Sequence, residues 1–389
     1  MVGSGTSLPA REAFQVSVGF PLSGATVLDF GTLVPGPMTS LMLAEAGARV
    51  IKIERPPAGD PMRAYEPQVD GASVHFHALN RGKSTVFVDL QSENGFEVLR
   101  PLLEEADFLI EQFRPGVMDR FGLGYDRIRS INPRIIYCSL TGWGQTGPKA
   151  SVAGHDLNFI AESGHLDKIC GADGAPVLPH LLAADIAGGV YPAVINILLA
   201  YIQRDVTGQG TYLDIAIFDG MMAFHYDVLT PALAMNLWPE RGRDLVTGGS
   251  PRYQLYPTAD GRHIAVAAME DRFWINFCDA IDLAPDLRSA EAPSETVKAV
   301  VAEKLASRTA ADWSLVFLGK DVCCSIVASL QEALGSAQVA ARGLLVGSVV
   351  TENGLIPTPP VPIASQFRDP AAYAPAPGGG RVRQARAGL

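Results

Sequence analysis

A histidine and an aspartate, thirty residues apart, are the residues whose types and spacing could do chemistry. His155 lies in the segment 153–159, which follows a turn-forming stretch at 143–148, and Asp185 lies where a long apolar helix is predicted to begin. An imidazole changes its charge near neutral pH, and a buried carboxylic acid can hold a proton there. On neighbouring elements, the two groups could face opposite sides of one carbon acid. One would then remove a proton and the other would return one.

Both residues also have purely structural interpretations. A Gly-His-Asp sequence in a loop is typical of a hydrogen-bonded turn, and an aspartate at the start of a helix is typically its N-cap. The apolar residues 181–184 precede Asp185, and burial among them would raise the pKa of its carboxyl group. The N–H groups of the helix N-terminus could also support an enolate oxygen. Spacing alone leaves chemistry and local structure both open.

Longer motifs resemble those of the family III CoA-transferases. Gly154-His155-Asp156-Leu157-Asn158-Phe159 and the segment 184–189 are similar to the catalytic blocks of the α-methylacyl-CoA racemases in that family. The resemblance continues, in the family's order, through 35–37, 50–56, 80–83, 88–90, 113–118 and 142–148. It therefore covers most of the chain.

The resemblance implies a fold and an assembly. The expected fold is α/β, with a large Rossmann-like domain and a smaller α/β domain. Two subunits would interlock into a homodimer, with each active site between the large domain of one subunit and the small domain of the other. Glu270 matches a small-domain glutamate that pairs with the histidine in the racemases. The implied catalytic set is therefore His155 with Glu270 on one side of the substrate and Asp185 on the other.

The same resemblance implies a CoA site. Arg55, Arg114 and Arg120 follow the ends of predicted strands, where open α/β sheets bind ligands, and arginine suits the CoA phosphates. Lys83 is a weaker addition. The other expected contacts are Phe87, Val88, Asp89, Leu90, Gln112, Phe113, Gly154, Asp156, Leu157, Asn158 and Phe159. CoA would arrive as part of the thioester substrate, so no separate cofactor and no metal are predicted.

Three functions fit this pattern. The first is racemisation of 2-methylacyl-CoA thioesters. The second is CoA transfer between carboxylic acids through an aspartyl-CoA thioester at Asp185. The third is CoA binding without catalysis. His155 favours racemisation, because the related transferases commonly have a bulky aromatic residue there. The stretch 61–78 resembles the transferase branch instead, and racemases often have tyrosine where this chain has Phe159.

Composition narrows the class of protein. The chain has 389 residues, of which 48% are hydrophobic, enough for two domains and a sizeable core. Its net charge of −10 argues against nucleic acid as a partner. Five cysteines without regular spacing are interpreted as reduced thiols. With no signal-peptide pattern and no apolar run of about 20 residues, a cytoplasmic protein without a membrane span is expected.

The elements that would position the site follow from local pattern. A βαβ opening is predicted from a strand at 25–30, a helix at 39–46 and a strand at 48–54. The segment 31–36 lacks the glycine spacing of a dinucleotide-binding loop. Further strands are expected at 85–90, 108–112, 135–140 and 211–217, with helices at 94–105 and 218–236.

Five segments are expected along the chain. They are an N-terminal extension (1–24), a large domain (25–236), a linker (237–252), a small domain (253–343) and a return segment with a tail (344–389). The small domain should begin with a hairpin of strands at 253–257 and 262–267. Helices at 271–280, 296–307 and 310–318 should follow.

Overall fold

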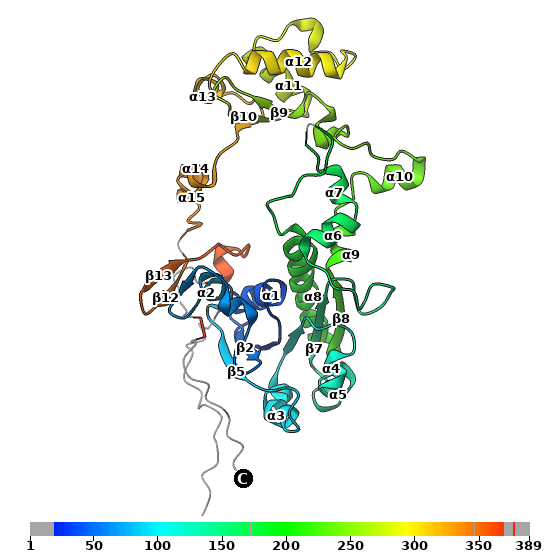
Figure 1. Ribbon diagram of the computed structural model, residues 1–389, viewed down its shortest axis with the longest axis vertical. Coiled ribbons are helices and arrows are strands. Elements are labelled where there is room, and N and C mark those ends of the chain that lie inside the picture. Colours follow the sequence, from blue (N-terminus) through cyan, green and yellow to red (C-terminus); the bar gives the residue numbers. More distant parts are fainter. Residues whose placement is uncertain (1–18, 172, 346, 369–375, 378–389) are drawn as a thin grey trace, which may run out of the picture. The chain divides into compact units, whose positions relative to one another are not determined.

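The computed structural model describes residues 19–171, 173–345, 347–368 and 376–377 (Figure 1). These residues divide into two compact units. Unit 1 contains the described residues of Met1–Ile160, Leu181–Phe224 and Arg342–Leu389, and unit 2 contains those of Ala161–His180 and His225–Ala341. Residues 161–180 and 225–236, expected in the large domain, therefore belong to unit 2, as does the expected linker. Most of the expected N-terminal extension lies outside the described residues.

A six-stranded parallel sheet forms the centre of unit 1 (Figure 1). Its strands, in spatial order β5-β2-β1-β6-β7-β8, are Ser84–Phe87, Arg49–Glu54, Thr26–Asp29, Phe108–Glu111, Ile136–Thr141 and Thr211–Ala216. The winding direction reverses between β1 and β6, so this is a doubly wound sheet with its switch point there. The predicted Rossmann-like architecture and all six predicted strands are confirmed.

Burial explains why these segments form parallel strands. Val27, Leu28 and the apolar residues of β6 are fully buried, and every residue of β7 is buried. Such continuous runs are typical of strands covered on both faces. Helices α3 (Gly95–Glu105) and α5 (Tyr125–Ile131) share one hydrophobic cluster with the sheet. Helices α1 (Pro35–Glu45) and α8 (Tyr191–Thr207) contact each other and the strands.

One helical stretch, Ala184–Thr207, is long and apolar enough to cross a membrane when judged by length and composition alone. Within unit 1 one face of this stretch packs into the core. Val190, Ala193 and Ile197 are fully buried, and the buried Arg204 forms an ion pair with Asp107 at 2.8 Å.

Shorter elements complete unit 1. They are η1 (Pro61–Ala64), β3 (Gln68–Val69), β4 (Ala72–Ser73), α2 (Val74–Asn80), α4 (Val117–Arg120), η2 (Ala184–Val190), α9 (Ile217–Ala223), β12 (Ser348–Thr351), β13 (Gly354–Pro357) and η5 (Ser365–Phe367). Helix α6 (Asp156–Glu162) crosses from unit 1 into unit 2.

Unit 2 is built on a three-stranded antiparallel sheet of order β11-β10-β9. Its strands are β9 (Tyr253–Pro257), β10 (His263–Ala267) and β11 (Cys324–Ile326), and its longer helices are α11 (Asp271–Ala280), α12 (Ser294–Leu305) and α13 (Ala310–Phe317). Trp274, Phe277 and Trp313 lie in its buried core. The predicted hairpin and three helices are confirmed. The shorter elements are α7 (His165–Lys168), α10 (Leu229–Met235), η3 (Leu245–Gly249), η4 (Pro285–Leu287), α14 (Leu330–Leu334) and α15 (Ala337–Ala341).

The single helix predicted over 218–236 is wrong. Helix α9 ends at Ala223 and α10 begins at Leu229. Pro231 gives the reason, because proline has no backbone N–H and its ring clashes with the carbonyl four residues earlier in a helix. It is tolerated in the first turn, where α10 places it.

Candidate active site

Asp185 lies in the first turn of η2, a π-helical segment that continues directly into α8. Its backbone N–H donates a hydrogen bond to Oδ1 of Asp156 at 2.9 Å. The N-cap residue is Ala183, so the interpretation of Asp185 as an N-cap is wrong. Single π-helical turns often occur at functional sites, because they redirect side chains that an α-helix would place elsewhere.

The carboxyl group of Asp185 can exchange a proton near neutral pH. Burial is the main cause, and the neighbouring charge of Asp156 adds to it; together they raise the pKa of Asp185 to about 6. The expected source of that burial is wrong, since Leu181 and Leu182 are 69% and 46% exposed. Ala184, by contrast, is fully buried.

His155 precedes α6 in an exposed turn. Its backbone N–H donates to Oδ1 of Asn158 at 3.0 Å, and its carbonyl accepts from the N–H of Asn158 at 2.8 Å. A proton on the imidazole would place a positive charge near Asp185, and this charge lowers the pKa of Asp185 against the effect of burial. The structure therefore brings His155, Asp156 and Asp185 together in unit 1.

The aromatic ring of Phe159 packs tightly against the turn that contains His155. Phe159 is only 2% exposed, and a Cβ atom on Gly154 would lie 2.8 Å from its ring. The same ring would lie 2.4 Å from a Cβ on Gly142. Only glycine fits at these two positions, and Phe159 is placed as a packing residue beneath the turn. Leu157 and Asn158 are exposed.

The residues expected around CoA follow neighbouring strands at the carboxyl edge of the sheet. Arg55 follows β2, and Phe87 ends β5, whose extension is fixed by the N–H of Val88 donating to the Glu54 carbonyl at 2.9 Å. Asp89 is exposed and Leu90 is half-buried just beyond. Because only β1 separates β2 from β6, the chain positions after these two strands start about 10 Å apart.

The loop after β6 contributes the remaining expected residues. Arg114 is exposed, and Arg120 is exposed at the end of α4. The side chain of Gln112, by contrast, is engaged within the protein. Its Oε1 accepts from the N–H groups of Thr32 and Gly36, both at 3.0 Å, and so ties the loop after β6 to the loop after β1. Gln112 thus spans the switch point of the sheet.

A buried charge network next to this edge was not predicted. Lys83 and Asp29 pair at 3.1 Å, and Lys52 and Asp60 pair at 2.9 Å, with all four side chains fully buried. Burial lowers the pKa of Lys83 to about 8 despite the attraction of Asp29. Lys83 is therefore a structural residue and is not exposed to a phosphate. The charged residues inside the apolar runs of β1 and β2 were the available signal.

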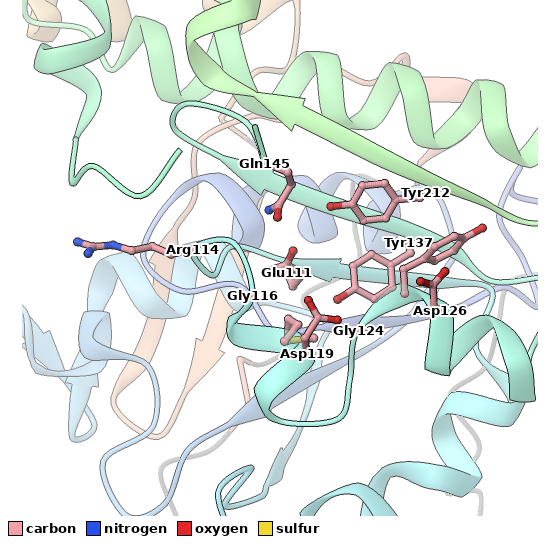
Figure 2. Close-up of a pocket in the computed structure, with 11 residues that line it drawn as sticks. Glu111, Arg114, Gly116, Asp119, Gly124, Asp126, Tyr137, Gln145 and Tyr212 are labelled. Atoms are coloured by element: carbon pink, nitrogen blue, oxygen red, sulfur yellow. The ribbon is translucent and has the colours of Figure 1, made fainter. Parts of the chain in front are cut away.

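A pocket of about 400 Å³ lies beside the loop after β6 (Figure 2). It is lined by Glu111, Arg114, Gly116, Met118, Asp119, Gly124, Tyr125, Asp126, Tyr137, Gln145 and Tyr212. Arg114 extends away from the other side chains in Figure 2. Burial raises the pKa of Glu111 to about 7, while its carboxylate accepts from the N–H of Phe113 at 2.7 Å. A proton on Glu111 therefore acts directly on the loop expected to contact CoA.

Glu270 lies in unit 2, where it is exposed and occupies the N-cap position of α11. Its pairing with the histidine of a partner subunit stays a prediction. Within the part of the chain that the structure describes, no group of three or more His, Cys, Asp or Glu side chains could hold a metal ion.

Comparison with known proteins gives consistent matches over most of the chain. Residues 22–381 match CoA-transferase family III. The chain is 33% identical to the human α-methylacyl-CoA racemase and 33% identical to the acetyl-CoA:oxalate CoA-transferase of Acetobacter aceti, covering 90% of both chains in each case. Identity alone therefore does not separate racemase from transferase.

Solved structures give the same result. A CAIB/BAIF family protein from Brucella suis superimposes with a TM-score of 0.75 at 30% identity, over 89% of this chain and 93% of that one. Rv3272 from M. tuberculosis superimposes with a TM-score of 0.78 at 28% identity, over 92% of this chain and 97% of that one.

Proposed function

Since the chain belongs to CoA-transferase family III, we propose that it is a racemase that interconverts (R)- and (S)-2-methylacyl-CoA thioesters. The observation that carries this proposal is the pairing in one site of His155 with a carboxyl group whose pKa is raised to about 6. A two-base racemase needs one group that accepts a proton and one that already holds a proton at the same pH.

The reaction follows from these protonation states. Neutral His155 takes the α-proton, and the electrons of the broken C–H bond move into an enolate whose negative charge lies on the thioester oxygen. Protonated Asp185 then gives its proton to the opposite face of the α-carbon, and the enolate electrons return to form the new C–H bond. Glu270 of the partner subunit would stabilise the imidazolium. The reverse reaction exchanges the two roles.

A second function, CoA transfer, is supported by equal sequence similarity. The acetyl-CoA:oxalate CoA-transferase of A. aceti is as similar to this chain as the human racemase is. In that reaction the ionised Asp185 carboxylate would attack the thioester carbonyl of the donor. The C–S bond of the donor would break, releasing CoA as a thiolate and leaving a mixed anhydride between the acyl group and Asp185. The thiolate would then attack the Asp185 carbonyl of this anhydride, which forms the aspartyl-CoA thioester and releases the donor acid as its carboxylate.

Hydrogen exchange separates these functions. (R)- or (S)-2-methylacyl-CoA is incubated in heavy water with wild-type protein, and deuterium at the α-carbon is measured together with configuration. We expect deuterium incorporation with inversion. His155→Ala and Asp185→Asn should each abolish inversion, and one of them should retain exchange on a single face. Asp205→Asn, at an exposed aspartate of α8, is the matched control and should behave as wild type.

The opposite result identifies the alternatives. A hydroxylamine-sensitive adduct on Asp185, with CoA movement to an added carboxylate and without deuterium uptake, would replace the racemase by the transferase. Binding of the thioester with neither deuterium uptake nor an adduct would indicate a non-catalytic CoA-binding protein.

A further inference from the structure

Trp143 lies between the turn that carries His155 and the segments that carry Asp185. Its ring centroid is 5.0 Å from that of Phe159, with the planes at 73°, and 5.4 Å from that of Phe218, with the planes at 42°. Aromatic pairs at such distances and angles pack favourably beyond the area they bury. The three rings form a continuous bridge within unit 1, here called the aromatic bridge.

On one side, the aromatic bridge supports His155. The ring of Phe159 lies so close to Gly154 that a Cβ atom there would be 2.8 Å away. His155 follows Gly154 directly, and its N–H and carbonyl are both bonded to Asn158 in the same turn as Phe159. Any displacement of the Phe159 ring therefore moves the backbone of His155.

On the other side, the aromatic bridge is attached to η2. Phe218 belongs to α9, and its N–H donates to the carbonyl of Gly142 at 3.0 Å. Helix α9 and η2 are in contact through their backbones. A Cβ atom on Gly220 would lie only 2.0 Å from the Gly188 carbonyl oxygen, so glycine is needed there. Contacts this close leave no room for sliding, so α9 moves with the segment that contains Asp185.

The position of Trp143 depends on its ring and not on its N–H group. Its Nε1 atom is buried without a hydrogen-bond partner among the described residues. The other three tryptophans, Trp238, Trp274 and Trp313, each donate this N–H to an oxygen at 2.8–2.9 Å. Ring shape is therefore the property of Trp143 that the surrounding structure uses.

We propose that Trp143 is a positioning residue that sets the distance between His155 and Asp185. The inference rests on the proposed function, because the distance matters when both groups must reach one α-carbon. The rate of proton transfer falls steeply when either group is displaced slightly from the α-carbon. Binding of the large CoA portion does not depend on the distance between His155 and Asp185. A change at Trp143 should therefore lower kcat and leave KM nearly constant.

The test compares Trp143→Leu and Trp143→Phe with wild type in the α-hydrogen exchange assay. We expect kcat to fall by about tenfold or more in Trp143→Leu, with KM changed by less than about twofold. Trp143→Phe keeps an aromatic ring and should restore part of kcat. Phe96→Leu, at a buried aromatic residue of α3 outside the aromatic bridge, controls for loss of stability.

A second variant keeps the test decisive if Trp143→Leu does not fold. Phe218→Leu removes the neighbouring ring and should lower kcat in the same way, and its effect should not add to that of Trp143→Phe. Folded Trp143 and Phe218 variants with wild-type kcat, or with raised KM alone, would contradict the positioning role. Absence of exchange by wild type would instead contradict the proposed function, so the two failures are distinct.

Discussion

The Oδ1 atom of Asp156 accepts a hydrogen bond from the backbone N–H of Asp185 at 2.9 Å. Because Asp156 follows His155 directly in the chain, this bond ties the turn that carries the imidazole to the segment that carries the carboxyl group. It also fixes one negative charge next to another. Asp156 is the second cause, after burial, of the raised pKa of Asp185. One residue thus contributes both to the geometry and to the protonation of the candidate site.

Asp156→Asn should lower the pKa of Asp185 while keeping the hydrogen bond between the two residues. The amide oxygen of asparagine can still accept from the Asp185 N–H, but the negative charge is gone. With less negative charge nearby, the Asp185 carboxyl group takes up its proton at a lower pH, so its pKa falls from about 6. In the direction in which protonated Asp185 donates its proton, activity is lost as Asp185 ionises, so we expect the alkaline limb of the kcat/KM profile to move to lower pH. Asp205→Asn should leave the limb in place.

An alkaline limb that stays in place in Asp156→Asn, or moves to higher pH, would show that Asp185 does not control the limb. Carboxyl carbon chemical shifts of Asp185, followed by NMR through the same pH range, would then report its titration independently of turnover.

Arg114→Ala should weaken CoA binding in a salt-dependent way. Arg114 is exposed in the loop after β6, and a guanidinium there can pair with a CoA phosphate. Exposed charge pairs are screened by salt, with a Debye length of about 10 Å at 0.1 M. Calorimetry with a CoA thioester should show a clear loss at low salt that shrinks at high salt. Arg129→Ala, at an exposed arginine of α5, should bind as wild type, and equal affinities for both variants would remove Arg114 from the site.

The sheet could be predicted because its strands are buried on both faces. Segments such as Phe108–Glu111 are short apolar runs between turns, and that pattern reports burial directly. The proximity of His155 and Asp185 was predicted from the resemblance of two motifs to a known family. Neither the hydrophobic period nor the spacing of residues shows which loops lie next to each other. Lys83 marks the limit of such reasoning. A lysine is normally exposed, and only the folded chain shows Asp29 beside it.

Contacts between distant segments were equally out of reach. The Asp156–Asp185 bond joins residues 29 positions apart, and the Gln112 bond to Gly36 joins residues 76 positions apart. In both bonds a side-chain oxygen accepts from a backbone N–H group. The types of the residues in a sequence do not show which side chain will bond to which backbone group. The aromatic bridge could not be predicted either, because the sequence shows Trp143 only as part of a turn motif.

Self-association should depend on α8. Its side chains Ile195, Leu199, Ile202 and Val206 recur at helical spacing and are all more than half exposed in the single chain. A continuous apolar stripe of this kind is typical of an interface. We expect a homodimer in sedimentation, and Leu199→Lys should shift it towards monomer with loss of exchange activity. Leu315→Lys, at an exposed leucine of α13, is the control. An active monomeric wild type would contradict the interlocked assembly.

Glu111 makes stability depend on pH, in a direction that its burial dictates. The side chain is 3% exposed, and its pKa is raised from 4.5 to about 7, so the folded chain holds this proton more tightly than the unfolded chain. Stability should therefore fall as pH rises from about 4.5 to 7, by up to about 3 kcal/mol from this group. Glu111→Gln cannot ionise, so its stability relative to wild type should increase with pH. Urea unfolding at about pH 5 and pH 8, at one protein concentration, measures the difference. Glu104→Gln, at an exposed glutamate, is the control and should show the pH dependence of wild type. If the stability of Glu111→Gln changes with pH in parallel with that of wild type, Glu111 has the same pKa in the folded and the unfolded chain, and the prediction is wrong.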